Sequence, residues 1–306
     1  MIASKNKLVT AAATGLAAVL SAGLSLAPAS AHSPTQTPGS LAAPSAIFKV
    51  SSFNVLGSSH TVNSNQFESG TLRIRWAANL LERNNTSVVG FNELQQDQFN
   101  TFMRYTGDTY GIYPGDQLLR IDINDSIAWR RSEWALISKS TFQIPYFDGN
   151  MRAMPIVRLR HRATGLDTYF VNVHNPATNK KHPNSDPYRR RATTIEIDLI
   201  NRLRLEGLPI VLLGDMNERE YYFCRMTGEA PMEAARGGYN RNGECDAENP
   251  RSVSWIFGSR RLDFDNYREA EHGLVQRITD HRVLFSDVIV DGEKFPRAVS
   301  DVLPGR

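Results

Sequence analysis

Cysteine is scarce in this sequence of 306 residues, which contains only Cys224 and Cys245. A zinc site made of cysteines, or a catalytic cysteine–histidine pair, is disfavoured because neither residue has a second cysteine close by. In an exported protein, an even number of cysteines at this spacing instead predicts one disulfide. In the loop-entropy description, such a crosslink stabilises the fold by roughly 3 kcal/mol.

Several motifs of nucleotide and acyl chemistry are also missing. The sequence has no glycine-rich phosphate loop, no dinucleotide-binding fingerprint and no Gly-x-Ser-x-Gly elbow, which disfavours the enzyme classes built on them. The net charge is small, because the formal +3 falls to +1 once a signal peptide carrying two lysines and no acidic residue is removed. That charge alone does not indicate binding to nucleic acid.

One long apolar run lies at the start of the chain. Lys5 and Lys7 precede this run over residues 8–26, and Ala29-Ser30-Ala31 follows it. This order predicts a secretory signal peptide over residues 1–31, with cleavage near Ala31. A membrane anchor is disfavoured because no positive stop-transfer cluster follows, so we expect a secreted, extracellular protein without a stable anchor after cleavage.

The rest of the chain divides into a leader and one domain. Residues 32–45 are rich in proline, serine and threonine, which predicts a flexible leader, and residues 46–306 suffice for one large core. Several strands follow one another without intervening helices, which favours mixed sheets with helices outside over a purely parallel sheet. Strands are expected near 47–54, 87–93, 126–129, 134–138, 155–160, 168–174, 210–213, 262–266 and 282–290, and helices near 72–83 and from 186 onward.

Polar residues lie at the ends of many of these strands. A single one is usually a turn or cap residue, but six endings made of carboxylate, amide or imidazole groups are hard to explain by turns alone. Because a scaffold gathers distant residues at its strand ends, we expect one site. The residues are Asn54, Asn92, Glu93, His174, Asn175, Asp215, Asn217, Asp263, Thr279, Asp280 and His281.

This set of side chains suits phosphoester hydrolysis. Oxygen ligands such as Glu93, Asp280 and Asn54 suit Mg²⁺ or Mn²⁺ and do not suit zinc. Such a cation neutralises a phosphate oxygen and stabilises charge on the leaving group. A histidine held by a carboxylate can take a proton from water or donate one to the phosphoryl oxygens. Asp215 and Asn217 lie on one side of an extended segment, so one can orient the water while the other donates to the phosphate.

Six motifs together resemble the endonuclease/exonuclease/phosphatase family over residues 47–290. They are SFN (52–54), GFNELQ (90–95), NVHNPA (172–177), GDMN (214–217), RRLDF (260–264) and TDH (279–281). The resemblance implies an α/β fold, a four-layer α/β sandwich with two mixed β-sheets packed face to face and helices outside. It also implies that residues 46–306 form a catalytic domain that uses Mg²⁺ or Mn²⁺, with the motifs at one end of the sheets. One departure is mild, because Thr279 replaces the usual serine and keeps its hydroxyl.

By position, the resemblance makes Glu93 the principal metal ligand, with Asn54 beside it and Asp280 completing the ligand set. Asp215 would then orient or deprotonate the attacking water, and Asn217 would hold the scissile phosphate.

The two histidines share the remaining roles, and the sequence leaves their assignment open. His281, steadied by Asp263, would be the general base or a phosphate contact, and His174 would be a second phosphate donor or the general acid. Asn175 and Arg152 are predicted substrate contacts, with a plain surface position as an equal alternative for Arg152.

Other residues have simpler explanations. Asn124, Asp125 and Asp97 fit turn or cap positions better than a place behind the site. Trp129 and Trp134 alternate with apolar residues, as core residues do. The histidines outside the motifs, which are His60, His161, His182 and His272, are interpreted as surface or structural residues.

The leading hypothesis for the substrate is nucleic acid. Residues 179–192 carry five lysines and arginines after His174, and export suits the scavenging of extracellular DNA or RNA. A sphingomyelinase-like or inositol-phosphate-like hydrolase is the alternative, with Ile144-Pro145-Tyr146-Phe147 as the nearest candidate for a membrane-contacting hairpin. A non-catalytic binding module is a further alternative, but it predicts eroded strand ends and none is eroded. A monomer is expected.

Overall fold

The computed structural model describes residues 43–118 and 124–298. The predicted signal peptide, and the leader up to residue 42, lie outside these described residues. The first strand begins at Ser45, one residue before the predicted start of the domain. Within the described residues, no helix has both the length and the apolar character needed to cross a membrane.

The first sheet has six strands in the order β13-β14-β1-β2-β4-β3. β1 and β2 are parallel, and all other neighbours in this sheet are antiparallel. The strands are β1 Ser45–Asn54, β2 Val88–Asn92, β3 Tyr110–Tyr113, β4 Ser126–Arg130, β13 Asp263–Ala270 and β14 Val283–Asp291.

The second sheet also has six strands, in the order β5-β6-β7-β8-β12-β9. β7 and β8 form its parallel pair. The strands are β5 Trp134–Pro145, β6 Met151–His161, β7 Asp167–His174, β8 Ile210–Asp215, β9 Met232–Ala234 and β12 Ser254–Ser259, and a separate hairpin joins β10 Tyr239–Arg241 to β11 Glu244–Asp246.

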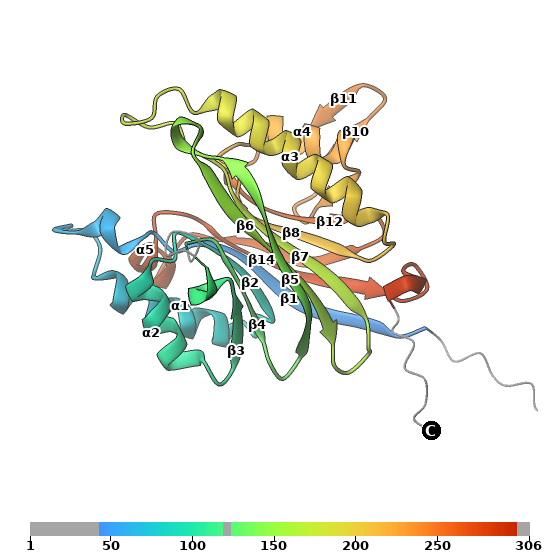
Figure 1. The fold of residues 1–306 in the computed structure, drawn as a ribbon, viewed down its shortest axis with the longest axis horizontal. Coiled ribbons are helices and arrows are strands. Elements are labelled where there is room, and N and C mark those ends of the chain that lie inside the picture. Colours follow the sequence, from blue (N-terminus) through green and yellow to red (C-terminus); the bar gives the residue numbers. More distant parts are fainter. Residues whose placement is uncertain (1–42, 119–123, 299–306) are drawn as a thin grey trace, which may run out of the picture. The chain divides into compact units, whose positions relative to one another are not determined.

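Helices cover the outer face of each sheet, as Figure 1 shows. The layer on the first sheet contains α1 Gly70–Arg83, α2 Gln96–Thr106 and α5 Leu274–Ile278, and that on the second contains α3 Asp186–Arg204 and α4 Glu220–Glu229. Between the sheets, Phe48 packs edge-to-face against Trp134 and Phe170. The predicted four-layer α/β sandwich is confirmed, as is the burial of Trp129 and Trp134. Short 3₁₀ helices lie at Ser58–Thr61, Gly115–Gln117, Phe147–Gly149 and Pro296–Ala298.

The two parallel pairs explain why polar residues gather at one end. Parallel strands end at the same edge of a sheet, and their connections run through a helix, here α1 and α3. In the first pair Asn54 lies opposite Asn92, and in the second His174 lies opposite Asp215. The two edges meet, because the backbone N–H of Asp215 donates to Asn92 Oδ1 at 3.0 Å.

The segment 218–258, for which no helix or strand is predicted from the sequence, has its own structure. It contains α4, β9, the β10–β11 hairpin and most of β12. The predicted disulfide is confirmed: Cys224 in α4 is joined to Cys245 in β11, with 5.8 Å between their Cα atoms. Helix α2 and strand β3 are further elements that the sequence pattern did not indicate.

Candidate active site

The carboxylate of Asp215 forms the centre of the site. It is fully buried at the end of β8. Its Oδ2 accepts a hydrogen bond from Asn54 Nδ2 at 3.1 Å and lies 3.3 Å from His281 Nδ1. Its Oδ1 accepts the backbone N–H of Asn217 at 3.0 Å. One carboxylate therefore connects strand ends from both sheets.

Asn217 is held by the segment that follows β7. Its φ of 49° lies in the left-handed region, which asparagine tolerates better than most residues. Its Nδ2 donates to the backbone carbonyl of Asn175 at 2.8 Å, and the N–H of Asn175 donates to the carbonyl of Asp215 at 2.9 Å. The bond to the Asn175 carbonyl therefore fixes the orientation of the Asn217 amide, including its second N–H.

Asn175, a predicted substrate contact, holds Asn217 in place through its backbone. Its side chain is fully buried and lies close to Glu196 of α3, beneath the site. The pKa of Glu196 is raised to about 7 by burial, which outweighs the hydrogen bond that Tyr222 donates at 2.7 Å. Asn175 thus supports Asn217 through its backbone carbonyl and does not face solvent.

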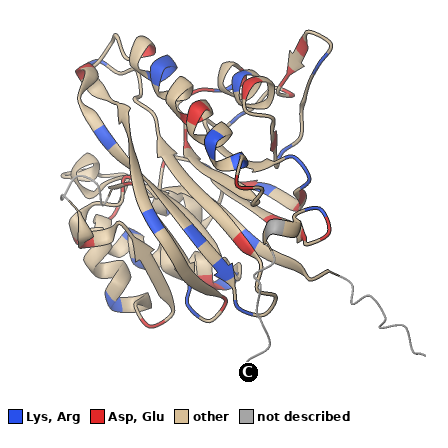
Figure 2. Cartoon of the chain, turned by 45° about the vertical axis from the view of Figure 1, so that its right-hand side comes forward, with Lys and Arg blue, Asp and Glu red and all other residues tan. Residues whose placement is uncertain are grey.

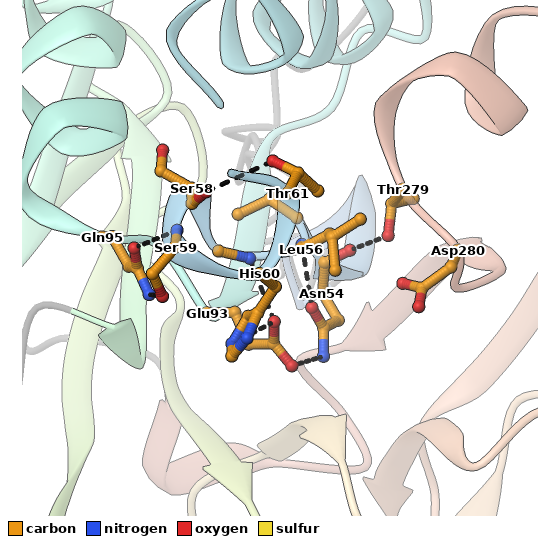
Figure 3. Close-up of polar contacts among 12 residues, drawn as sticks. Asn54, Leu56, Ser58, Ser59, His60, Thr61, Glu93, Gln95, Thr279 and Asp280 are labelled. Atoms are coloured by element: carbon orange, nitrogen blue, oxygen red, sulfur yellow. Dashed lines mark hydrogen bonds and ion pairs between the residues drawn. The ribbon is translucent and has the colours of Figure 1, made fainter. Parts of the chain in front are cut away.

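Glu93 lies beside Asn54, as Figure 3 shows. Its Oε1 accepts from Asn54 Nδ2 at 3.0 Å, and its Oε2 accepts from the N–H of Gly57 at 3.0 Å. Burial alone would raise the pKa of Glu93, but the charge of His174, these hydrogen bonds and the charge of His60 hold it below its ordinary value. A partly buried carboxylate that stays ionised is suited to bind a cation.

His60 belongs to the site, although sequence reasoning treats it as a surface residue. Its Nε2 lies 3.4 Å from Glu93 Oε2, and its side chain is 55% exposed. It lines a pocket of about 430 Å³ together with Glu93, Asp280, His281 and Phe67.

The segment Thr279–His281 is fastened to the end of β1. Thr279 Oγ1 donates to the carbonyl of Asn54 at 2.9 Å and accepts the N–H of His281 at 3.1 Å. The hydroxyl that Thr279 shares with serine therefore orients the histidine. Asp280 is about half exposed and faces the pocket beside Glu93, with its Oδ1 3.8 Å from His281 Nε2.

The predicted contact between Asp263 and His281 is wrong. Asp263 forms an ion pair with Lys294 at 2.6 Å, and His281 contacts Asp215. The cause is the antiparallel register of β13 and β14, which sets Asp263 opposite Ile289. Ile289 lies six residues beyond the start of β14, or about 20 Å along the strand, from the segment that carries His281.

His174 ends β7 as a buried imidazole. Its Nδ1 lies 3.3 Å from Asp125 Oδ1, which also accepts from Asn92 Nδ2 at 3.1 Å. Burial alone would lower the pKa of His174, but Asp125, Asp215 and Glu93 raise it above its ordinary value. These carboxylates therefore stabilise the imidazolium form, which suits a donor to phosphate.

Asp125 is the functional residue that sequence reasoning missed. It fits a turn before β4, but its carboxylate is fully buried. The register of β2 and β4 is the signal that identifies it, because Phe91 lies opposite Ser126 and so brings the preceding Asp125 to the end of β2. Its Oδ2 lies 3.6 Å from Arg152, whose guanidinium stacks 3.6 Å from the ring centroid of Tyr146. Arg152 is thus placed beside His174, at the wall of the site.

The side chains around Glu93 fit a hard divalent cation. In residues 43–118 and 124–298, no three His, Cys, Asp or Glu side chains are gathered closely enough to hold a metal by themselves. Mg²⁺ requires no such group, because it keeps several waters and binds through one or two carboxylates and phosphate oxygens. Glu93 and Asp280 supply two carboxylates to one pocket, with the amide of Asn54 beside them.

A sequence profile of the endonuclease/exonuclease/phosphatase family matches residues 51–266, which is more than half of the chain. The chain belongs to the endonuclease/exonuclease/phosphatase family. Members of this family are hydrolases of phosphoester bonds, and the matched range contains Asn54, Glu93, His174 and Asp215. The match ends before Asp280 and His281, which the structure brings to the same site.

Solved structures show the same family fold. A family protein from Bacteroides thetaiotaomicron has 14% sequence identity and a TM-score of 0.63, and the match covers 82% of this chain and 98% of that chain. A mannosyl-6-phosphatase from the same organism has 14% identity and a TM-score of 0.59, covering 79% and 99%. The human nocturnin catalytic domain with bound sulfate has 12% identity and a TM-score of 0.60, covering 79% and 94%. A comparison with curated protein sequences gives no match.

We predict that Asp125→Asn lowers the pKa of His174. The substitution removes the carboxylate that does most to keep the imidazole protonated and leaves the burial that opposes protonation. NMR titration of the histidine side chains, with His272→Gln to assign an exposed signal, measures the change. A His174 titration curve that is unchanged in the variant would contradict the assignment of this pair.

We predict that Glu196→Gln makes stability less dependent on pH. Because the folded protein raises the pKa of Glu196 from 4.5 to about 7, its contribution is present below pH 4.5 and is lost as pH rises through 7. The variant should gain up to about 3 kcal/mol relative to wild type between pH 5 and pH 8. Urea unfolding at both pH values measures the gain, with exposed Glu244→Gln as the control. Parallel pH curves for wild type and Glu196→Gln would refute the prediction.

Proposed function

We propose that this protein is a divalent-metal-dependent phosphoester hydrolase in which an activated water attacks phosphorus in line with the leaving group. The observation that carries the proposal is the position of Asp215 between His281 and Asn217, with Asn54 Nδ2 donating to both Asp215 and Glu93. In this arrangement, a water bound to Asp215 can pass its proton to the carboxylate, while the side chains of His281 and Asn217 donate to the phosphoryl oxygens.

Each residue has a separate task in this mechanism. When bound at Glu93 and Asp280, a divalent cation supplies charge neutralisation to the phosphate and the leaving oxygen. Asp215 orients the attacking water. His281, which is fixed by Thr279, contacts the carboxylate of Asp215 and holds it in position. His174, held protonated by Asp125, donates to a phosphoryl oxygen or to the leaving group.

Export to the extracellular space is part of the proposal. Its support is the predicted signal peptide together with the disulfide between Cys224 and Cys245, because structural disulfides belong to oxidising compartments. A monomer without a membrane anchor stays a prediction.

Nucleic acid remains the first substrate to test. Lys180 and Lys181 are exposed on the segment that follows His174, where they can attract a polyanion. The attraction is weaker than the sequence indicated, because Arg189 in the same basic stretch is paired with Asp186 and Glu218. Charges of both signs are also interspersed over the elements in Figure 2.

A compact phosphoester is the second candidate, and the residues that line the site favour it. Glu271, Asp280 and Arg282 line the pocket next to that of Glu93, and Arg282 is itself paired with Glu271. The acidic lining suits a short ester with a neutral leaving group better than a long polyanion. The similarity in fold to a mannosyl-6-phosphatase and to a sulfate-bound nocturnin domain agrees with this candidate. Sphingomyelin and an inositol phosphate belong to the same comparison.

We predict that Asp215→Asn lowers kcat on bis(p-nitrophenyl) phosphate by about 10²–10⁴-fold, as expected for loss of a proton-transfer group. Asp263→Asn is the matched control, because this carboxylate pairs with Lys294 at the far end of β13. It should stay within about twofold of wild type. Equal losses in both variants would contradict the assignment.

We predict metal-dependent turnover that EDTA abolishes and Mg²⁺ or Mn²⁺ restores. Residues 32–306 should be assayed on plasmid DNA, RNA, sphingomyelin, an inositol phosphate and a sugar phosphate in parallel. Cleavage of DNA or RNA assigns a nuclease, and turnover of a small ester alone assigns the second candidate. No turnover of any of these, or of the chromogenic diester, would refute the proposed function and support a binding module.

A further inference from the structure

Arg73 in α1 is a fully buried arginine behind the site. It lies on the inward face of α1, next to Ile74 and Ala77. A buried arginine is rare because removing its charge from water is costly unless the charge is paired. No carboxylate within the described part of the chain forms an ion pair with Arg73, although the charges of Asp280, Asp97 and Glu93 act on it. Burial outweighs them and lowers its pKa.

The guanidinium donates to three backbone carbonyls and one hydroxyl behind the pocket. Nη1 donates to the carbonyl of Val55 at 2.8 Å and to that of Ile278 at 2.7 Å. Nε donates to the carbonyl of Glu68 at 3.0 Å, and Nη2 donates to Thr61 Oγ1 at 3.1 Å. A single planar group therefore joins α1 to the chain between Val55 and Glu68 and to Ile278, which is 205 positions away in the sequence.

The two carbonyls that share Nη1 flank residues of the site. Val55 directly follows Asn54, and Ile278 directly precedes Thr279. The Thr279 hydroxyl closes the same junction from the other side by donating to the carbonyl of Asn54. Arg73 and Thr279 therefore both bond the end of β1, which carries Asn54, to the segment that carries Asp280. Figure 3 shows the bond from Thr279 to Asn54.

We propose that Arg73 is a positioning residue that holds the Asp280–His281 segment at a fixed distance from Asn54 and Glu93, so that both carboxylates face one cation. The proposal rests on the proposed metal-dependent function. Simple packing does not require a charge here, since an apolar side chain fills such a space at lower cost. The planar, forked guanidinium is needed to bond the carbonyls of Val55 and Ile278 together with the other acceptors, because a lysine cannot reach several acceptors in one plane.

The test compares Arg73→Lys and Arg73→Met with the control Arg75→Lys, an exposed position on the same helix that stacks on Tyr105. Calorimetric titration with Mn²⁺ and Mg²⁺ alone should show at least about tenfold weaker binding for Arg73→Lys and unchanged binding for the control. With bis(p-nitrophenyl) phosphate at saturating metal, kcat should fall more than KM rises. The reason is that Asp280 and His281, once displaced, stabilise the transition state less well. If Arg73→Met fails to fold, the lysine variant still decides.

Hydrogen exchange gives a readout that does not depend on metal or substrate. The backbone amides of residues 274–282 should exchange faster in Arg73→Lys than in wild type. Their exchange rate should be unchanged in the control. A lower melting temperature with wild-type metal affinity and wild-type exchange would overturn the inference, because the role would then be purely structural. If wild type itself neither binds metal nor turns over ester, the proposed function fails, and faster exchange of this segment alone supports the positioning role.

Discussion

The buried carboxylate of Asp215 is the interaction on which the catalytic end of the fold depends. A buried carboxylate is stable only when hydrogen bonds or charges replace the water that it has lost. Here the replacements come from both halves of the sandwich: Asn54 belongs to the first sheet, and Asn217 follows β8 of the second. A shift of one sheet against the other would remove a partner, so the bonds that satisfy this carboxylate also fix the sheets at this end.

Two residues of the site adopt backbone conformations that the rest of the fold must maintain. Glu93 has a φ of 61° and Asn217 a φ of 49°, and such conformations cost on the order of 1–3 kcal/mol each for non-glycine residues. Both follow strands whose residues are fully buried, so their backbones have little freedom to relax. The large core, with Phe48 packed against Trp134, therefore stabilises a geometry that the local sequence alone disfavours.

Sequence reasoning located the site because its residues end apolar strands, and parallel pairing brings such ends together. It misplaced Asp263 because the RRLDF motif was judged by its letters, while the position of its carboxylate depends on the register of β13 and β14. It missed Asp125 and Arg73 because an aspartate before a strand and an arginine in a helix are ordinarily at the surface. Only packing reveals that both are buried, and burial is what gives each a partner in the site.

The charge of the site changes sign from one wall to the other. Glu93 and Asp280 face the pocket on one side, while Arg152 lies beside His174 on the other. The loop of Lys180 continues the basic wall, since its neighbour His182 stacks on the β5–β6 hairpin. A phosphate is attracted to the basic wall but repelled by the carboxylates until a cation neutralises them. In the proposed mechanism, cation and phosphate therefore favour each other's binding, and the scissile phosphorus would lie beside Asp215, where the charge changes sign.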